Sequence, residues 1–161
     1  FVLNSTHDAI STLDRRRIVI IGASAGGHLA LMTGLRLSAS RVRAAISISG
    51  IADPRPDAAA FPDRYRTLFG HDATPADLDS ISPMPFLRPD GPRLLLTHSH
   101  HDTVVPIASA INLVAAAKQA GAPVESYFYH RQNDGHCIWL PDSNPHKLHP
   151  DIEDAIRTFL L

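Results

Sequence analysis

The sequence predicts an α/β protein with a doubly wound, mostly parallel sheet and helices on both of its faces. Short runs of apolar residues, many of them β-branched, alternate along the chain with segments of helical periodicity, and the links between them are short. A run of six small residues joins the first of these strands to the helix that follows it. At 161 residues the chain is expected to form one domain, residues 1–161, with a substantial core.

The first strand and helix carry the most informative stretch. Ile18–Ile21 is four β-branched apolar residues and predicts a strand buried on both faces, and the Ala-rich segment Leu29–Leu37 predicts a helix. Between them, residues 22–27 read Gly-Ala-Ser-Ala-Gly-Gly. So tight a turn requires a positive φ at the turning residue and little bulk beside it. We therefore expect Ser24 to present its hydroxyl at the carboxyl end of the sheet, beside the free N–H groups of a helix start.

Other glycine-rich motifs fit this stretch less well. In a dinucleotide-binding Gly-x-Gly-x-x-Gly motif, Ser24 would occupy the position of the second glycine. A phosphate-binding loop requires Gly-Lys-Ser/Thr, but His28 follows Gly27. The pentapeptide taken alone is equally consistent with a plain strand-to-helix turn built of small residues.

The remaining elements follow in order. A helix is expected before the first strand, capped by Ser5 or Thr6. Further strands are predicted at Ala44–Ser49, Pro92–His98 and Val124–Tyr129, and further helices at Pro106–Ala120 and Asp151–Leu161.

Residues 51–90 interrupt the pattern and predict a loop-rich insertion. Residues 53–56, Asp-Pro-Arg-Pro, predict a turn, Phe61–Phe69 predicts a short helix, and Thr74 is a suitable helix cap. An insertion over the carboxyl ends of the strands often shapes a substrate pocket. A plain connection between strands is the equal alternative.

Composition narrows the functional classes. The hydrophobic fraction is 44% and the formal charge is −1, which gives no reason to expect nucleic acid or an anionic membrane as a partner. No apolar run reaches the length of a membrane span. The lone Cys137 excludes an internal disulfide and fits a reducing compartment such as the cytoplasm. Ten histidines require that metal binding be considered.

The order of three polar residues suggests nucleophilic catalysis. A serine hydroxyl needs a base to accept its proton, and the imidazole needs a carboxylate to fix its tautomer. In a parallel sheet such groups emerge at the carboxyl ends of strands. Asp102 follows the third predicted strand and His136 follows the fourth, so the order along the chain is Ser24, Asp102, His136.

Other residues compete with Asp102 for the role of acid and with His136 for the role of base. His28, in the first turn of the helix after Ser24, is expected to be a packing or hydrogen-bonding residue. The competing acids are Asp134 and Asp142, and the competing bases are His130, His146 and His149.

Three motifs together resemble the α/β-hydrolase serine esterases. These are Gly-Ala-Ser-Ala-Gly-Gly-His-Leu-Ala at residues 22–30, His98-Ser99-x-x-Asp102-x-x-Val105-Pro106, and Gly135-His136. The group most similar to this chain is that of the acetyl-esterase and feruloyl-esterase-like carboxylesterases, which have His-Gly where this chain has His-Ser.

The resemblance implies an activity and a role for each residue. The expected activity is hydrolysis of small carboxylic esters through an acyl-enzyme, without a cofactor. Ser24 is then the nucleophile, Asp102 the orienting acid and His136 the general base. The backbone N–H of Ala25 is one donor of the oxyanion hole.

Two alternatives belong to other functional classes. His98-x-His100-x-Asp102 resembles the metal-binding motif of the metallo-β-lactamase-like hydrolases, and imidazoles with a carboxylate suit zinc. Against it, Thr103 stands where that motif has a histidine, and the strand-rich surroundings of the motif are not predicted here. The other alternative is a catalytically inactive hydrolase-like scaffold used for binding.

The resemblance also implies that the N-terminal part of the fold is lacking. Similar esterases place several strands, and a loop with the other oxyanion donor, before the nucleophile, whereas this chain reaches Ser24 within about two dozen residues. Loss of one oxyanion donor costs about 3 kcal/mol of transition-state stabilisation. Ile18–Ile21 would then form an exposed apolar edge, which predicts a homodimer or association with a missing N-terminal segment.

Overall fold

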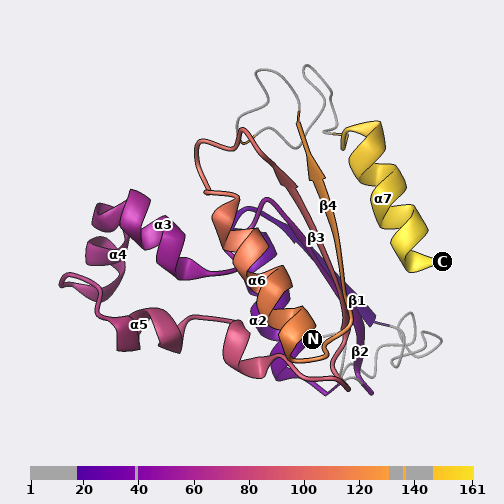
Figure 1. Ribbon diagram of the computed structural model, residues 1–161, viewed down its shortest axis with the longest axis horizontal. Helices are drawn as coiled ribbons and strands as arrows, with labels where there is room; N and C mark the ends of the chain where they lie inside the picture. The colour runs from indigo at the N-terminus through magenta and orange to yellow at the C-terminus, as the bar shows by residue number, and fades with distance from the viewer. Residues whose placement is uncertain (1–17, 39, 131–135, 137–146) are drawn as a thin grey trace, which may run out of the picture.

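The computed structural model describes residues 18–38, 40–130, 136 and 147–161. They form a four-stranded sheet in the order β1-β2-β3-β4, in which each neighbouring pair is parallel (Figure 1). The strands are β1 (Ile18–Ala23), β2 (Val42–Ile48), β3 (Arg93–Ser99) and β4 (Val124–Tyr129). The helix expected before β1 lies outside the described residues.

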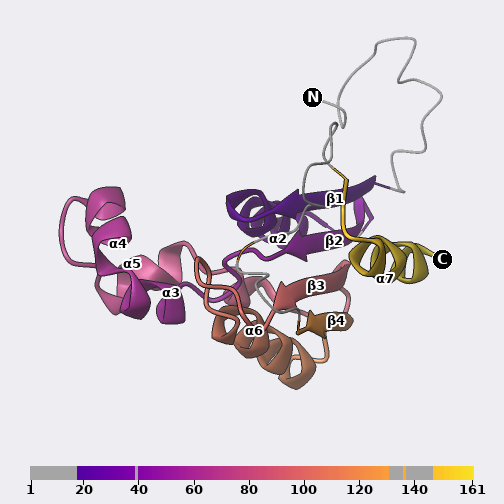
Figure 2. The ribbon, with the colours of Figure 1, turned by 90° about the horizontal axis from the view of Figure 1, so that it is seen from above.

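Helices cover both faces of the sheet (Figures 1 and 2). Helices α2 (Ala25–Arg36) and α6 (Ala108–Gln119) pack on one face, and α7 (Pro150–Leu160) packs on the other. Because successive strand residues point to opposite faces, β3 contributes Leu94 and Leu96 to the first core and Leu95 to the second. The predicted doubly wound α/β fold is therefore confirmed. None of the helices in the described part of the chain has the length and hydropathy needed to cross a bilayer.

Strand β1 lies at the edge of this sheet, and the prediction that it is buried on both faces is wrong for the described residues. Ile18–Ile20 are half-buried and Ile21 is 50% exposed. The reason is that β1 has one described strand neighbour, β2, so its other side lacks a paired strand among these residues. Association of this edge with a second copy or with another segment stays a prediction.

Residues 51–90 contain more helix than expected. They hold α3 (Pro54–Ala60), α4 (Pro62–Phe69), α5 (Pro75–Ser80) and the 3₁₀ turn η1 (Met84–Phe86). The turn predicted at residues 53–56 is instead the start of α3, where the Asp53 carboxylate accepts a hydrogen bond from Arg55 N–H. The cap predicted at Thr74 is confirmed, since Thr74 and Asp77 form a capping box. Helices α3–α5 extend from the sheet on the side away from α7 (Figures 1 and 2).

A buried serine on α6 fixes where this insertion begins. Ser109 Oγ accepts hydrogen bonds from Ala52 N at 2.8 Å and Asp53 N at 2.9 Å, and it donates to Asp53 O at 2.8 Å. Asn112, one turn further along α6, donates to Asp53 Oδ2 at 2.8 Å. The start of the insertion is thereby attached to α6, which packs on the sheet.

Candidate active site

Ser24 stands between β1 and α2 with a strained backbone. Its φ is 54° and its ψ is −125°, a conformation that non-glycine residues rarely adopt. Its backbone N–H donates to Ile48 O at 2.9 Å, which ties the turn to the end of β2. The predicted positive φ at the turning residue is therefore confirmed. Strain of this kind collects at functional sites.

The glycines around Ser24 differ in what they contribute. A Cβ on Gly22 would overlap the carbonyl oxygen of Gly26, and a Cβ on Gly27 would lie 2.7 Å from Ser47 Oγ. Among the described residues, a Cβ on Gly26 would meet no heavy atom within 4 Å. The close approach of α2 to the sheet therefore depends on Gly22 and Gly27 rather than on Gly26.

The structure brings Ser24, Asp102 and His136 into one hydrogen-bonded chain. His136 Nε2 lies 2.8 Å from Ser24 Oγ, and His136 Nδ1 lies 2.8 Å from Asp102 Oδ2. Because an ionised carboxylate only accepts, Nδ1 carries the imidazole proton and Nε2 accepts from the serine hydroxyl. A hydroxyl in contact with an oriented base is the arrangement required for nucleophilic catalysis.

The carboxylate of Asp102 is buried and accepts several hydrogen bonds. Its side chain is 0% exposed, and Oδ1 accepts from the backbone N–H groups of Val104 at 2.9 Å and Val105 at 2.8 Å. His98 Nε2 donates to Val105 O at 2.9 Å and lies 3.2 Å from Asp102 Oδ2. Burial raises the pKa of Asp102, but the hydrogen bonds from His136, His98, Val105 and Val104 outweigh it and hold that pKa below its ordinary value. The carboxylate is therefore ionised at neutral pH.

The rival residues that are described lie elsewhere. The His130 ring stacks on the His100 ring with centroids 3.8 Å apart, and His149 is the N-cap residue of α7. His28 Nδ1 donates to Ile51 O at 2.8 Å, which confirms its expected hydrogen-bonding role. Asp134, Asp142 and His146 lie outside the described residues.

The residues of the metal alternative are not gathered into a ligand set. His98 Nε2 is directed to Val105 O and Asp102, whereas the ring of His100 stacks on His130. Among the described residues, no group of three or more His, Cys, Asp or Glu side chains could hold a metal ion. The donor geometry of this part of the chain therefore gives no support to the zinc interpretation.

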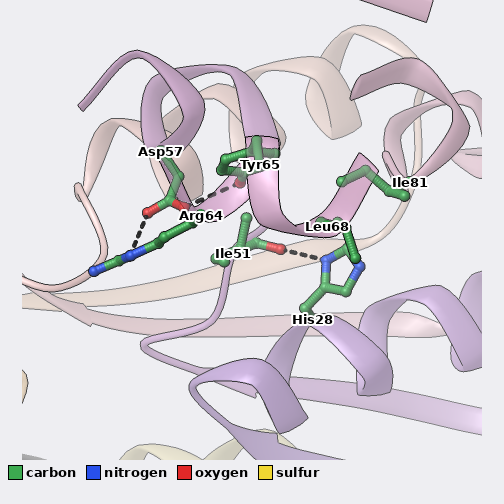
Figure 3. Close-up of a pocket in the computed structure, with 7 residues that line it drawn as sticks. All are labelled: His28, Ile51, Asp57, Arg64, Tyr65, Leu68 and Ile81. Carbon is green, nitrogen blue, oxygen red and sulfur yellow. Dashed lines mark hydrogen bonds and ion pairs between the residues drawn. The ribbon is translucent and has the colours of Figure 1, made fainter. Parts of the chain in front are cut away.

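A largely apolar cavity of about 430 Å³ lies between α2 and the insertion. His28 on its α2 side is four residues after Ser24, about one helical turn away. Figure 3 shows the His28 ring directed from α2 towards the insertion, which supplies Leu68 and Ile81. The lining residues are His28, Ile51, Asp57, Arg64, Tyr65, Leu68 and Ile81.

A buried carboxylate joins two of the insertion helices beside this cavity. Tyr65 Oη donates to Asp57 Oδ2 at 3.0 Å, and Arg64 Nη1 donates to Asp57 Oδ1 at 3.2 Å (Figure 3). Burial raises the pKa of Asp57 despite these two donors, and burial together with Asp57 raises the pKa of Tyr65. No motif in the sequence predicted this cluster. Asp57 lies on α3 and its partners on α4, so no single helical spacing links them.

Fold and sequence together place the chain among the α/β-hydrolases. The sequence matches the model of the prolyl oligopeptidase family over residues 6–153, and the chain therefore belongs to that family. No curated protein sequence matches it.

Several solved structures share the fold. A thermophilic esterase from the Planctomycetes species Thermogutta terrifontis, with propionate bound, has a TM-score of 0.69 and 22% identity, covering 96% of this chain and 58% of its own. A truncated carbohydrate esterase from gut microbiota has a TM-score of 0.64 and 24% identity, covering 80% of this chain and 55% of its own. A puromycin-hydrolysing peptidase from Mycobacterium tuberculosis has a TM-score of 0.64 and 25% identity, covering 74% of this chain and 19% of its own. The chain thus spans little more than half the length of the two esterases.

Proposed function

We propose that this protein is a serine hydrolase that cleaves small carboxylic esters through an acyl-enzyme. Ser24 is the nucleophile, His136 the general base and Asp102 the acid that orients it. The observation that supports this most strongly is the continuous chain from Ser24 Oγ through the His136 ring to Asp102 Oδ2, with both contacts at 2.8 Å. Membership of a hydrolase family supports the same reaction class.

The proposed reaction proceeds in two halves. As Ser24 Oγ attacks the ester carbonyl carbon, His136 Nε2 takes the hydroxyl proton and a tetrahedral intermediate forms. The intermediate expels the alcohol, to which His136 returns the proton, and the acyl group remains bonded to Oγ. Water then attacks the acyl-enzyme while His136 accepts its proton. The Ser24 oxygen leaves with that proton, and a carboxylic acid is released.

The surroundings of His136 suit both of its roles. Asp102 holds the Nδ1 proton, so Nε2 is free to act as a base, and the buried carboxylate stabilises the imidazolium that forms. The N–H of Ala25 is proposed as an oxyanion donor. Ala25 is the first residue of α2, where N–H groups lack an intrahelical partner and the positive end of the helix dipole lies.

Amide hydrolysis is the second candidate. The family is that of prolyl oligopeptidase, and a structural neighbour hydrolyses puromycin, which both favour a peptidase. The same three side chains would serve, because His136 would protonate the leaving amine instead of an alcohol. The two candidates therefore differ in substrate and not in the residues that act.

Initial rates on two chromogenic substrates separate the candidates. The full chain is assayed with p-nitrophenyl acetate and with aminoacyl p-nitroanilides, beside Ser24→Ala and with EDTA present. We expect hydrolysis of the ester, its loss in Ser24→Ala and no effect of EDTA. Preference for the anilides would favour the peptidase. A rate that EDTA abolishes and that Ser24→Ala retains would instead indicate a metal-dependent reaction at His98, His100 and Asp102.

A further inference from the structure

The loop that carries Asp102 is held from outside by the insertion. This acid loop, residues 100–106, contains Val104, whose N–H donates to Asp102 Oδ1 at 2.9 Å. The carbonyl oxygen of the same Val104 accepts from Arg64 Nη1 of helix α4 at 2.9 Å. Val104 thus joins the Asp102 carboxylate to the guanidinium of Arg64, which lies 40 positions before Val104 in the sequence.

Arg64 is itself fixed, although its side chain is 43% exposed. Its Nη1 also donates at 3.2 Å to the Asp57 carboxylate, which is 0% exposed. The guanidinium lies over the Phe61 ring, 3.8 Å from the ring centroid. Burial of Asp57 and stacking on Phe61 limit the positions that the Arg64 head can take.

We propose that Arg64 is a positioning residue that holds the acid loop so that Asp102 meets His136, an inference that rests on the proposed function. Arg64 also lines the apolar cavity beside α2. The wall of the cavity and the triad acid are therefore joined through one side chain.

The chemistry of arginine fits this role better than that of other cations. Two hydrogens on the one nitrogen Nη1 serve Asp57 and Val104 O together, while the planar group stacks on Phe61. Lysine carries a charge and donors on a single flexible nitrogen and restores only part of this geometry. Methionine fills similar space without any donor, so Val104 O and buried Asp57 both lose a partner.

The test compares Arg64→Met and Arg64→Lys with Arg66→Met. Arg66 lies on the same helix and pairs only with the exposed Asp63 and Asp72 in the contacts described for it, away from the acid loop. Each full-length variant is assayed for kcat and KM on p-nitrophenyl acetate and for thermal melting. Proton NMR records the downfield resonance of the His136 Nδ1–H that is donated to Asp102.

We expect Arg64→Met to lower kcat roughly tenfold with little change in KM, because small displacements of a catalytic group cost rates of this order or more. The downfield His136 Nδ1–H resonance of Arg64→Met is expected to shift or broaden. We expect Arg64→Lys to give an intermediate kcat and resonance, and Arg66→Met to match the wild type in both. An unchanged kcat and resonance in Arg64→Met overturns the proposal. Equal losses in Arg64→Met and Arg66→Met that follow the melting temperatures also overturn it, because they indicate general destabilisation. If the wild type hydrolyses nothing, the proposed function fails while the resonance still tests the positioning.

Discussion

His136 Nδ1 lies 2.8 Å from Asp102 Oδ2, although 34 positions separate the two residues in the chain. Each follows one of two adjacent parallel strands, β3 and β4, which are paired from Leu94↔Val124 to Ser99↔Tyr129. Because the carboxyl ends of parallel strands meet at one edge of the sheet, the loops that follow them approach each other there. Ser24, the third residue of this hydrogen-bonded chain, reaches the same edge from β1, which lies two strands away from β3.

Asp102→Asn tests the orienting role of the carboxylate. The amide cannot stabilise an imidazolium, and its NH₂ group favours the wrong tautomer of His136, so we expect kcat on p-nitrophenyl acetate to fall by about 10³–10⁴-fold. Asp63→Asn, at an exposed carboxylate on α4, is the matched control and should keep the wild-type rate. A loss of less than tenfold in Asp102→Asn would contradict the assignment.

The lowered pKa of Asp102 also predicts how stability depends on pH. In the unfolded chain an aspartate titrates at about pH 3.9, whereas in the folded protein the pKa of Asp102 is lower. The stabilisation is therefore fully present above that unfolded value and is lost as pH falls towards the folded pKa. Urea unfolding between about pH 6 and 2 should show a steeper loss of unfolding free energy on acidification for the wild type than for Asp102→Asn. Parallel curves would show that Asp102 does not contribute in this way.

The central strands and the helices that cover them were predictable because their apolar patterns are local. The strand Val124–Tyr129 has the predicted bounds, and the boundaries of β2 and β3 shift by one or two residues. Helix α2 begins at Ala25 rather than Leu29, because the small residues after Ser24 already adopt helical geometry. The burial of β1 was not predictable from its own residues, since it depends on how many strands lie beside it.

The insertion shows where local patterns mislead. The prolines at residues 53–56 predicted a turn, yet a proline is well accommodated in the first turn of a helix, and α3, α4 and α5 each begin with one. Ser24, Asp102 and His136 could be selected from their positions after strands. The contact of Arg64 with Val104 O depends on how α4 packs against the acid loop, which no sequence spacing encodes.

Gly22→Ala and Gly26→Ala should differ sharply. The new Cβ at Gly22 overlaps the Gly26 carbonyl, so the strand-to-helix turn must shift and we expect both lower stability and loss of ester hydrolysis. At Gly26 the Cβ meets open space among the described residues, and alanine is the better helix former by about 1 kcal/mol. Circular-dichroism melting and esterase assays compare the pair. Equal damage from the two changes would contradict this account of the turn.

Ser109→Ala should loosen the attachment of the insertion to α6. It leaves the N–H groups of Ala52 and Asp53 without their buried acceptor, which costs about 1–3 kcal/mol. Ser80→Ala removes an exposed hydroxyl that donates to Asp77 O and should change the free energy of unfolding by less than about 0.5 kcal/mol. Urea denaturation measures both variants, and similar small effects would show that Ser109 does not anchor the segment.

Covalent trapping of Ser24 tests the proposed function most directly. The full chain is treated with a fluorophosphonate, which bonds to an activated serine oxygen with loss of fluoride, and intact and peptide masses are recorded beside Ser24→Ala, His136→Ala and the urea-unfolded chain. We expect one phosphonyl group on the peptide containing Ser24 in the folded wild type and none in the other three samples. An unlabelled wild type, or a label of the same yield in Ser24→Ala, would contradict the assignment of Ser24 as the nucleophile.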